Sequence, residues 1–331
     1  MQKDPSYYIQ GVRDGNRLML SRTITLIESS LSSHQELAAT VIEQLLPYSG
    51  NSVRLGITGV PGAGKSTFID SFGMLLTERG HRVAVLAIDP SSSRSGGSVL
   101  GDKTRMINLA AAGNAFIRPS PTGGTLGGAA RKTRESMLVC EAAGFDVIII
   151  ETVGVGQSET AVAAMVDFFL VLMIAGAGDE LQGIKKGILE VADAIAINKA
   201  DGNNRLPAEQ ARRQYETALH LIAPDNPLWS PPVLTCSALE KTGLTDIWET
   251  IDRHRHTLTA SGDLQRKRSR QSVAWFQQLL LDGLSSWFYN HPAIRERFPL
   301  VVREIEQSRL SPALAATSLL QSIYQDPSAR S

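Results

Sequence analysis

The 331-residue sequence has little cysteine and no excess of charge of either sign. Cys140 and Cys236 are its only cysteines. Neither belongs to a C-x-x-C pair, so the sequence predicts neither a disulfide framework nor a thiolate metal site. Lys plus Arg and Asp plus Glu each number 33, which argues against a general attraction to nucleic acid or anionic membranes. We therefore expect nucleotide and protein partners in a reducing cytoplasm.

A long apolar segment is also missing. The most membrane-like stretch, residues 161–178, is interrupted by Asp167, and its apolar part at 168–174 has the length of a strand. The N-terminus lacks the cationic start, apolar core and cleavage site of a secretory signal. We therefore predict no membrane segment and interpret residues 168–174 as a buried core strand.

The sequence does contain a series of short apolar runs that alternate with helically spaced segments. Continuous runs of Val, Ile and Leu are typical of parallel strands that are covered on both faces. The predicted strands are residues 53–58, 82–88, 115–118, 147–150, 168–174, 194–197 and 233–236. The predicted fold class is therefore α/β, with a doubly wound, mostly parallel sheet.

Helical spacing dominates on both sides of this pattern. We predict an N-terminal helical extension at 1–50, a nucleotide-binding domain at 51–260 and a C-terminal helical region at 261–331. Ser311 and Pro312 indicate the start of a last helix. The apolar positions of the C-terminal region require cover from its own domain or another subunit. The basic cluster at 266–270 is interpreted as a solvated helix start.

The sequence Gly-Val-Pro-Gly-Ala-Gly-Lys-Ser at residues 59–66 fits the phosphate-binding pattern G-x-x-x-x-G-K-[S/T]. A predicted strand precedes it and helical spacing follows it, as the pattern requires. Glycines let backbone N–H groups approach phosphate oxygens, Lys65 bridges the outer phosphates, and the Ser66 hydroxyl is a ligand for Mg²⁺. The residues predicted to contact a nucleoside triphosphate here are Gly59, Val60, Pro61, Gly62, Ala63, Gly64, Lys65, Ser66 and Thr67.

A second motif, Asn-Lys-Ala-Asp at residues 198–201, matches the guanine-reading pattern N-K-x-D and follows a predicted strand. The Asp201 carboxylate can accept hydrogen bonds from N1–H and the exocyclic amine of guanine, which adenine does not present together. The Lys199 stem can cover the base plane. The predicted guanine-contacting residues are Asn198, Lys199, Asp201, Ser237, Ala238 and Leu239. In this order after a phosphate loop, the motif predicts GTP and GDP as ligands rather than ATP.

Two carboxylates stand where a metal ion would meet the phosphates. Asp89 ends a predicted strand beside the phosphate loop, a suitable place to hold Mg²⁺ or its water shell. Glu151, Thr152, Val153 and Gly154 occupy the position at which most G proteins have D-x-x-G. We expect the Glu151 carboxylate near the metal and the Gly154 N–H near the γ-phosphate.

Five further segments carry a family resemblance. They read Ile-Asp-Pro-Ser-Ser at 88–92, Gly-Asp-Lys-Thr-Arg-Met at 101–106, Arg-Pro-Ser-Pro at 118–121, Glu-Thr-Val-Gly-Val-Gly-Gln-Ser-Glu at 151–159 and Gly-Asp-Glu-Leu-Gln-Gly-Ile-Lys-Lys-Gly at 178–187. With the phosphate loop and guanine motif, they make nearly the whole chain resemble the MeaB/ArgK group of G proteins. These are GTPase chaperones associated with adenosylcobalamin-dependent methylmalonyl-CoA mutase. The resemblance implies a P-loop GTPase of the G-protein type, with that mutase as partner and a homodimer formed through the C-terminal helices.

The resemblance also implies roles for residues outside the two motifs. Asp102 and Arg105 belong to a switch, in which Asp102 completes the metal shell or orients water and Arg105 contacts phosphates or a partner. Asp179 and Lys185 lie in a glycine-rich loop that the family uses as an extra switch toward the mutase. The predicted metal ligands are Ser66, Asp89, Asp102 and Glu151, and the predicted catalytic residues are Lys65, Asp102, Arg105, Glu151 and Lys185.

The expected rate of GTP hydrolysis by the isolated protein is slow. In well-known small G proteins a glutamine directly follows the D-x-x-G glycine and orients the attacking water. Here that position is Val155, and Gln157 stands two residues later. We therefore expect a partner to accelerate hydrolysis.

Two functions other than that of a GTPase chaperone are also considered for this sequence: a transport-linked kinase and a metal-insertion GTPase. The family's older label suggests a kinase linked to lysine, arginine and ornithine transport, but the guanine motif argues against the ATP that such a kinase usually needs. A metal-insertion GTPase would show a Cys/His cluster. The only close pair is His254 and His256, which we interpret as part of a solvated helix face.

Overall fold

The computed structural model of the chain describes residues 4–88, 105–119, 126–152, 158–176, 186–222 and 228–324. These residues form two units that meet in the sequence after Arg268, Met1–Arg268 and Ser269–Ser331.

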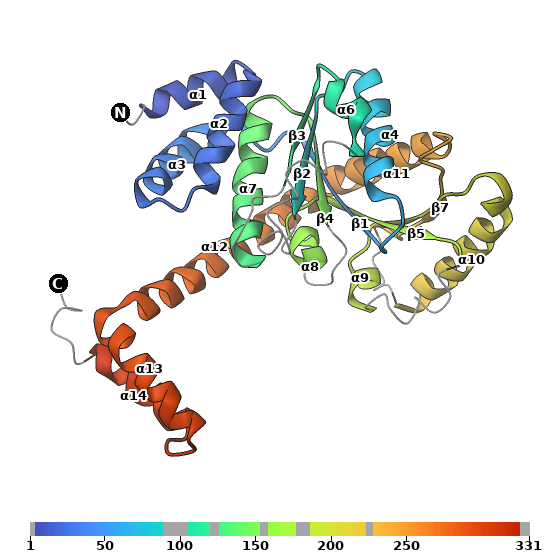
Figure 1. The fold of residues 1–331 in the computed structure, drawn as a ribbon. Helices are drawn as coiled ribbons and strands as arrows, with labels where there is room; N and C mark the ends of the chain where they lie inside the picture. The colour runs from blue at the N-terminus through green and yellow to red at the C-terminus, as the bar shows by residue number, and fades with distance from the viewer. Residues whose placement is uncertain are drawn as a thin grey trace. The chain divides into compact units, whose positions relative to one another are not determined.

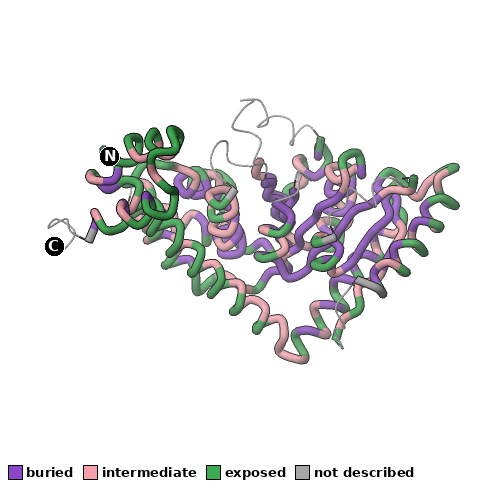
Figure 2. Tube along the Cα trace, turned by 90° about the horizontal axis from the view of Figure 1, so that it is seen from below, coloured by how far each residue is buried: buried purple, intermediate pink, exposed green. Residues whose placement is uncertain are grey.

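A seven-stranded parallel sheet lies at the centre of the first unit, with strand order β3-β2-β4-β1-β5-β6-β7 (Figure 1). The strands are β1 (Val53–Gly59), β2 (Val83–Ile88), β3 (Ala115–Arg118), β4 (Val147–Thr152), β5 (Phe168–Ile174), β6 (Ala194–Asn198) and β7 (Val233–Thr235). The predicted fold class and all seven predicted strands are confirmed. Helices cover both faces, which is why the strands are buried along most of their length and lack polar alternation (Figure 2).

The connections of the sheet identify where a ligand would bind. From β1 the chain moves outward to β2 and β3, returns to β4, and then crosses to β5, β6 and β7 on the other side of β1. In such open α/β sheets, ligands bind beyond the carboxyl ends of the strands where the direction of winding reverses. The loop after β1 lies at this point.

Two sets of helices cover the faces of the sheet. On one face lie α4 (Lys65–Glu78), α6 (Ile107–Ala111) and α11 (Leu244–Ala260). On the other lie α7 (Leu126–Ala142), α8 (Ser158–Ala163), α9 (Lys186–Glu190) and α10 (Arg205–Ile222), with the short 3₁₀ helix η3 (Gly202–Asn204) before α10.

The predicted N-terminal helices pack over α7. They are α1 (Pro5–Arg13), α2 (Arg17–Glu28) and α3 (Ser32–Leu45), followed by the 3₁₀ helix η1 (Leu46–Tyr48). Asp4 and Asn16 cap the first two helices, because their side chains accept backbone N–H groups of the first turn. Buried apolar residues of α2 and α3 join the same core as α7, so this extension is part of the first unit.

The second unit is helical. It contains most of α12 (Asp263–Asn290), which begins in the first unit, together with α13 (Pro292–Glu306) and α14 (Pro312–Tyr324). Ile294, Leu319 and Ile323 form a small core there. As predicted, Ser311 caps the last helix, since its Oγ accepts the Leu314 N–H at 3.3 Å.

The interpretation of the basic cluster at 266–270 as solvated is wrong for two of its members. Arg268 forms a two-pronged ion pair with buried Asp167, with Nε to Oδ1 at 2.8 Å and Nη2 to Oδ2 at 2.6 Å. Lys267 donates to the Asp167 carbonyl at 2.7 Å and lies 3.5 Å from Asp193 Oδ2. Local sequence does not reveal these partners, because they lie 74 to 101 residues away along the chain. Arg266 is exposed, as expected.

The interpretation of His254 as part of a solvated helix face is also wrong. Its side chain is 2% exposed, whereas that of His256 is 78% exposed. The His254 ring packs edge-on against Phe168 and Trp229. Burial lowers the pKa of His254, although the nearby Asp193 carboxylate acts in the opposite direction. The two histidines thus occupy different environments and form no shared site.

Among the described helices, none combines the length and the apolar character needed to cross a membrane.

Candidate functional site

The phosphate loop lies between the end of β1 and the start of α4, as its sequence context requires. Gly64, directly before α4, has φ of 82°, which L side chains rarely adopt. A Cβ at Gly64 would also lie 3.1 Å from Asn198 Nδ2. A larger residue at this position would therefore disturb both the loop and its neighbour.

Lys65 folds back over this loop. Its Nζ donates to the carbonyl of Gly59 at 2.9 Å and lies 3.4 Å from that of Val60. Burial lowers the pKa of Lys65, and the negative charges of Glu151 and Glu159 partly offset this effect. The ammonium group is thus held beside the first residues of the loop. There, phosphate oxygens can replace the Gly59 and Val60 carbonyls as its hydrogen-bond partners.

A hydroxyl and a carboxylate meet beside the loop. Ser66 Oγ, in the first turn of α4, lies 3.4 Å from Oε1 of Glu151 near the end of β4. Glu151 pairs with Ile57 across the β1–β4 ladder, so strand register determines its position. Hard oxygen donors of this kind suit Mg²⁺, which takes few protein ligands and binds phosphates and water as well. This pair therefore fits the predicted metal ligands Ser66 and Glu151.

The described residues contain no group of three or more His, Cys, Asp or Glu side chains that could hold a metal ion.

Asn198 joins the phosphate loop to the guanine loop. It ends β6 and is 1% exposed. Its Nδ2 donates to the carbonyl of Ala63 at 2.7 Å, and its Oδ1 accepts the N–H of Ala238 at 3.1 Å. The first residue of the guanine motif thus fixes the distance between the two loops.

A hydroxyl orients the carboxylate that is predicted to read guanine. Ser237 Oγ donates to Asp201 Oδ2 at 2.5 Å and also accepts the N–H of Glu240 at 3.0 Å. Ser237 is fully buried, so the position of the carboxylate is determined from within the protein. Lys199 has φ of 59°, a turn conformation directly after β6, and Leu239 is 79% exposed.

The other predicted site residues have mixed outcomes. Arg105 is exposed and lies two residues before the start of α6 at Ile107. Asp89, Asp102, Gly154, Asp179 and Lys185 lie outside the described residues, as do Val155 and Gln157. Their roles stay predictions.

Sequence reasoning missed Glu159 as a site residue. It lies at the start of α8, is 2% exposed, and its charge acts on Lys65. The available signal was its place at the end of segment 151–159. Its distance in sequence from Lys65 concealed the effect of its charge on the Lys65 pKa.

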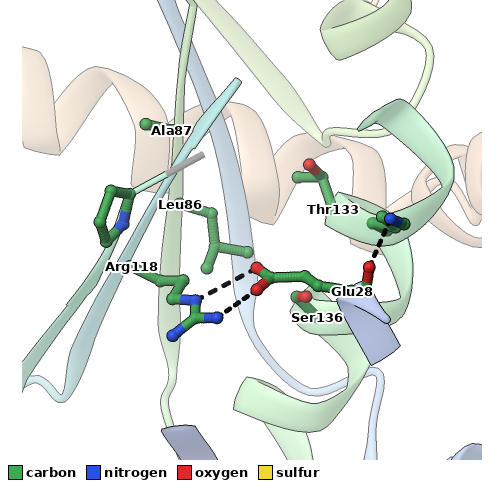
Figure 3. A pocket seen from close by; sticks show the side chains of 8 residues that line it. Glu28, Leu86, Ala87, Arg118, Thr133 and Ser136 are labelled. Atoms are coloured by element: carbon green, nitrogen blue, oxygen red, sulfur yellow. Dashed lines mark hydrogen bonds and ion pairs between the residues drawn. The ribbon is translucent and has the colours of Figure 1, made fainter. Parts of the chain in front are cut away.

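A small pocket lies at the ends of β2 and β3 (Figure 3). No residue of the phosphate loop lines it. The guanidinium of Arg118, at the end of β3, faces the carboxylate of Glu28, and Nε lies 3.1 Å from Oε1. Lys132 on α7 donates to the Glu28 carbonyl at 2.5 Å. These contacts attach the end of α2 to the sheet, so the pocket is occupied by a structural ion pair.

Comparisons with known proteins identify the relatives of this chain. The family model described as "Methylmalonyl Co-A mutase-associated GTPase MeaB" matches residues 20–293. A Mycobacterium tuberculosis protein named as a probable GTPase is 54% identical over 310 residues, covering 94% of this chain and 92% of that protein. The Escherichia coli "GTPase ArgK" is 50% identical over 315 residues, covering 95% of each.

A solved structure is similar over the same extent. The crystal structure titled "LAO/AO transport system kinase" has a TM-score of 0.78 and 43% sequence identity. The match covers 98% of this chain and 100% of that chain. The likeness thus includes the helical regions on both sides of the sheet domain.

Proposed function

This chain belongs to the MeaB family of methylmalonyl-CoA mutase-associated GTPases, and from that premise we propose that it regulates an adenosylcobalamin-dependent mutase as a GTP-driven chaperone. It is a P-loop GTPase and binds GTP and GDP. The proposed part is its purpose: the nucleotide state controls how the chain engages the mutase, and hydrolysis resets the interaction.

One observation carries the nucleotide part of this proposal. Asn198 bonds to the phosphate loop through the Ala63 carbonyl and to the guanine loop through the Ala238 N–H. A single buried side chain therefore sets the spacing between the phosphate-binding and base-binding ends of the site.

Different residues of the site have different roles in GTP hydrolysis. Lys65 and the loop N–H groups bind the outer phosphates, and Ser66 with Glu151 would hold Mg²⁺. When bound, that ion would neutralise negative charge on the phosphates. We propose that Arg105 contributes a further positive charge at the nucleotide. The absence of a glutamine at Val155 supports slow hydrolysis without a partner.

The mutase part of the proposal is supported by the printed description of the matching family. We also propose a homodimer. The apolar side chains at 273, 276, 280, 284 and 287 recur at three- or four-residue spacing along α12, and each is more than half exposed. A contiguous apolar face of this kind requires cover, and a second copy supplies a matching face.

The proposal is tested by measuring GTP hydrolysis in single turnover, alone and with the adenosylcobalamin-dependent methylmalonyl-CoA mutase of the same organism. We expect slow hydrolysis alone, an increase of roughly tenfold or more with the mutase, and little binding of ATP. Lys65→Ala should abolish hydrolysis because the outer phosphates lose their fixed cation. The same rate with and without mutase, and no complex between the two proteins, would refute the chaperone role.

The same samples test the alternative of a transport-linked kinase. That function requires transfer of the terminal phosphate of ATP to an acceptor other than water. Radiolabelled ATP and GTP should both leave the protein fraction and any added amino-acid-binding protein unlabelled. Labelling from ATP would favour the kinase.

A further inference from the structure

Asp70 lies on the phosphate-loop helix α4, one turn after Ser66. Its side chain is buried, with 8% of the residue exposed. Oδ1 accepts the backbone N–H of Leu109 at 2.8 Å, and Oδ2 accepts the side-chain amide of Asn108 at 2.7 Å. Both carboxylate oxygens are therefore directed at the first turn of α6, which packs against α4.

A steric feature supports the same contact. A Cβ added to Gly73 of α4 would lie 2.5 Å from Cδ2 of Leu109, so a larger residue at this position would require the Leu109 side chain to shift. Glycine inside a helix is less favourable than alanine, and the close packing of Leu109 against α4 explains its presence here. Leu109 and Met106 are 0% and 1% exposed within the core that also contains Phe72 of α4.

These contacts place Arg105 next to Met106, whose position is fixed by packing. Arg105 directly precedes Met106, whose buried side chain and carbonyl hold the start of α6; the carbonyl accepts the Ala110 N–H at 2.9 Å. The first turn of α4 carries Lys65 and Ser66, and its second turn carries Asp70. One short helix therefore connects the phosphate loop to the anchor of the segment that contains Arg105.

We propose that Asp70 is a positioning residue for GTP hydrolysis: by holding the start of α6 against α4, it fixes where Arg105 stands relative to Lys65 and Ser66. This inference rests on the proposed role of Arg105 at the nucleotide. Asp70 acts through α6 rather than by its charge on the phosphates. Its essential property is therefore a hydrogen-bond acceptor for the Leu109 N–H.

Two substitutions separate these properties. Asp70→Ala removes both acceptors, whereas Asp70→Asn removes the charge but keeps an oxygen for Leu109. We expect Asp70→Ala to slow single-turnover GTP hydrolysis roughly tenfold, since misplacement of a catalytic group by about 1 Å is this costly or more. The dissociation constant for GDP should change less than about twofold, and Asp70→Asn should restore most of the rate.

Asp146, directly before β4, provides a control at the amino-terminal ends of the strands. Its carboxylate likewise accepts one backbone N–H, from Arg82 at 2.7 Å, and contacts one side-chain nitrogen, of His81 at 2.8 Å. Asp146→Ala should lower the thermal unfolding midpoint and leave the hydrolysis rate unchanged. Gly73→Ala offers an independent route, because it displaces Leu109 while Asp70 stays intact, and it should also slow hydrolysis.

A spectroscopic measurement tests the contact without activity. Ile107 in α6 is 68% exposed, whereas Cys140 and Cys236 are buried, so a nitroxide can be attached selectively to Ile107→Cys. In the labelled full-length protein, Asp70→Ala should increase nitroxide mobility, and neither Asp70→Asn nor Asp146→Ala should do so.

The possible results are distinct. Unchanged rate and mobility in Asp70→Ala would overturn the proposal, as would equal slowing by Asp70→Ala and Asp146→Ala. Asp70→Asn as slow as Asp70→Ala would show that the charge acts directly, which also overturns it. If the unmodified protein neither binds nor hydrolyses GTP, the proposed function fails, while the mobility data still decide whether Asp70 anchors α6.

Discussion

At the scale of single residues, selection of the base depends on a carboxylate whose orientation is set by a buried hydroxyl. Asp201 is predicted to accept two guanine donors, and Ser237 fixes one of its oxygens at 2.5 Å. A site built around such hydrogen bonds rejects a ligand that lacks them far more strongly than an apolar pocket would.

Asp201→Asn should therefore exchange the preferred base. The amide can donate to O2 of xanthine, where guanine carries an amine, so XTP should bind and GTP should lose about 10²-fold or more in affinity. Calorimetry with both nucleotides measures the change. Asp252→Asn, an exposed substitution on α11, is the control and should leave both affinities unaltered. Retained GTP preference in Asp201→Asn would remove Asp201 from base recognition.

At the scale of elements, the segment that joins the N-terminal helices to β1 is clamped by buried charges. Glu141, at the end of α7, accepts the Gly50 N–H at 2.9 Å and the Ser52 hydroxyl at 2.5 Å. Arg268 donates to the carbonyls of the same two residues. The start of α12, the entry to β1 and the end of α7 are thus held by one network.

Asp167 completes this network, because it accepts the Arg54 N–H as well as the Arg268 guanidinium. Asp167→Asn should lower the free energy of unfolding by about 3 kcal/mol, since it removes the carboxylate that forms the two-pronged ion pair with the largely buried Arg268. Urea unfolding followed by circular dichroism measures the effect.

Two comparisons make this stability measurement specific. Glu209→Gln removes an exposed carboxylate that pairs with Arg212 on α10 and should leave the unfolding midpoint unchanged. Adding Arg268→Met to Asp167→Asn should recover part of the loss, because the buried positive charge is then removed as well. Equal stability of Asp167→Asn and the unmodified protein would show that the network contributes nothing measurable.

At the scale of the whole molecule, the proposed homodimer accounts for the apolar face of α12. Phe276 and Leu280 are 63% and 53% exposed on that face. Replacing both with Glu should convert the protein to a monomer, because paired like charges would then have to be buried at the interface.

Light scattering coupled to size exclusion measures this change in mass. Gln278→Glu with Ser285→Glu adds the same charge at two exposed positions on the opposite side of α12 and should leave the dimer intact. GTP affinity should be retained in both double variants, since the site residues lie in the first unit. A monomeric unmodified protein would refute the homodimer.

Prediction from sequence was most complete where function depends on neighbours along the chain. The phosphate loop needs a strand, a turn and a helix in immediate succession, and the sequence pattern of residues 53–79 predicts all three. The seven strands were likewise predictable, because a sheet covered on both faces demands unbroken apolar runs. The order of the motifs also predicted that Ser66 and Glu151 lie together at the carboxyl ends of the strands.

Prediction failed where a polar residue depends on a partner far along the chain. His254 and Arg268 carry the same chemistry whether they face water or a buried partner, and local spacing does not distinguish the two. Asp70, Glu159 and the clamp around Glu141 escaped notice for the same reason.

The sequence by itself determined the class of ligand, the parallel sheet and the family, because glycine geometry, apolar periodicity and the guanine motif are local properties. Only the tertiary structure decided which charges are buried together, how Asn198 joins the two loops and why Gly73 admits α6. These depend on distances between segments separated by tens to hundreds of residues, and such distances exist only once the chain has folded.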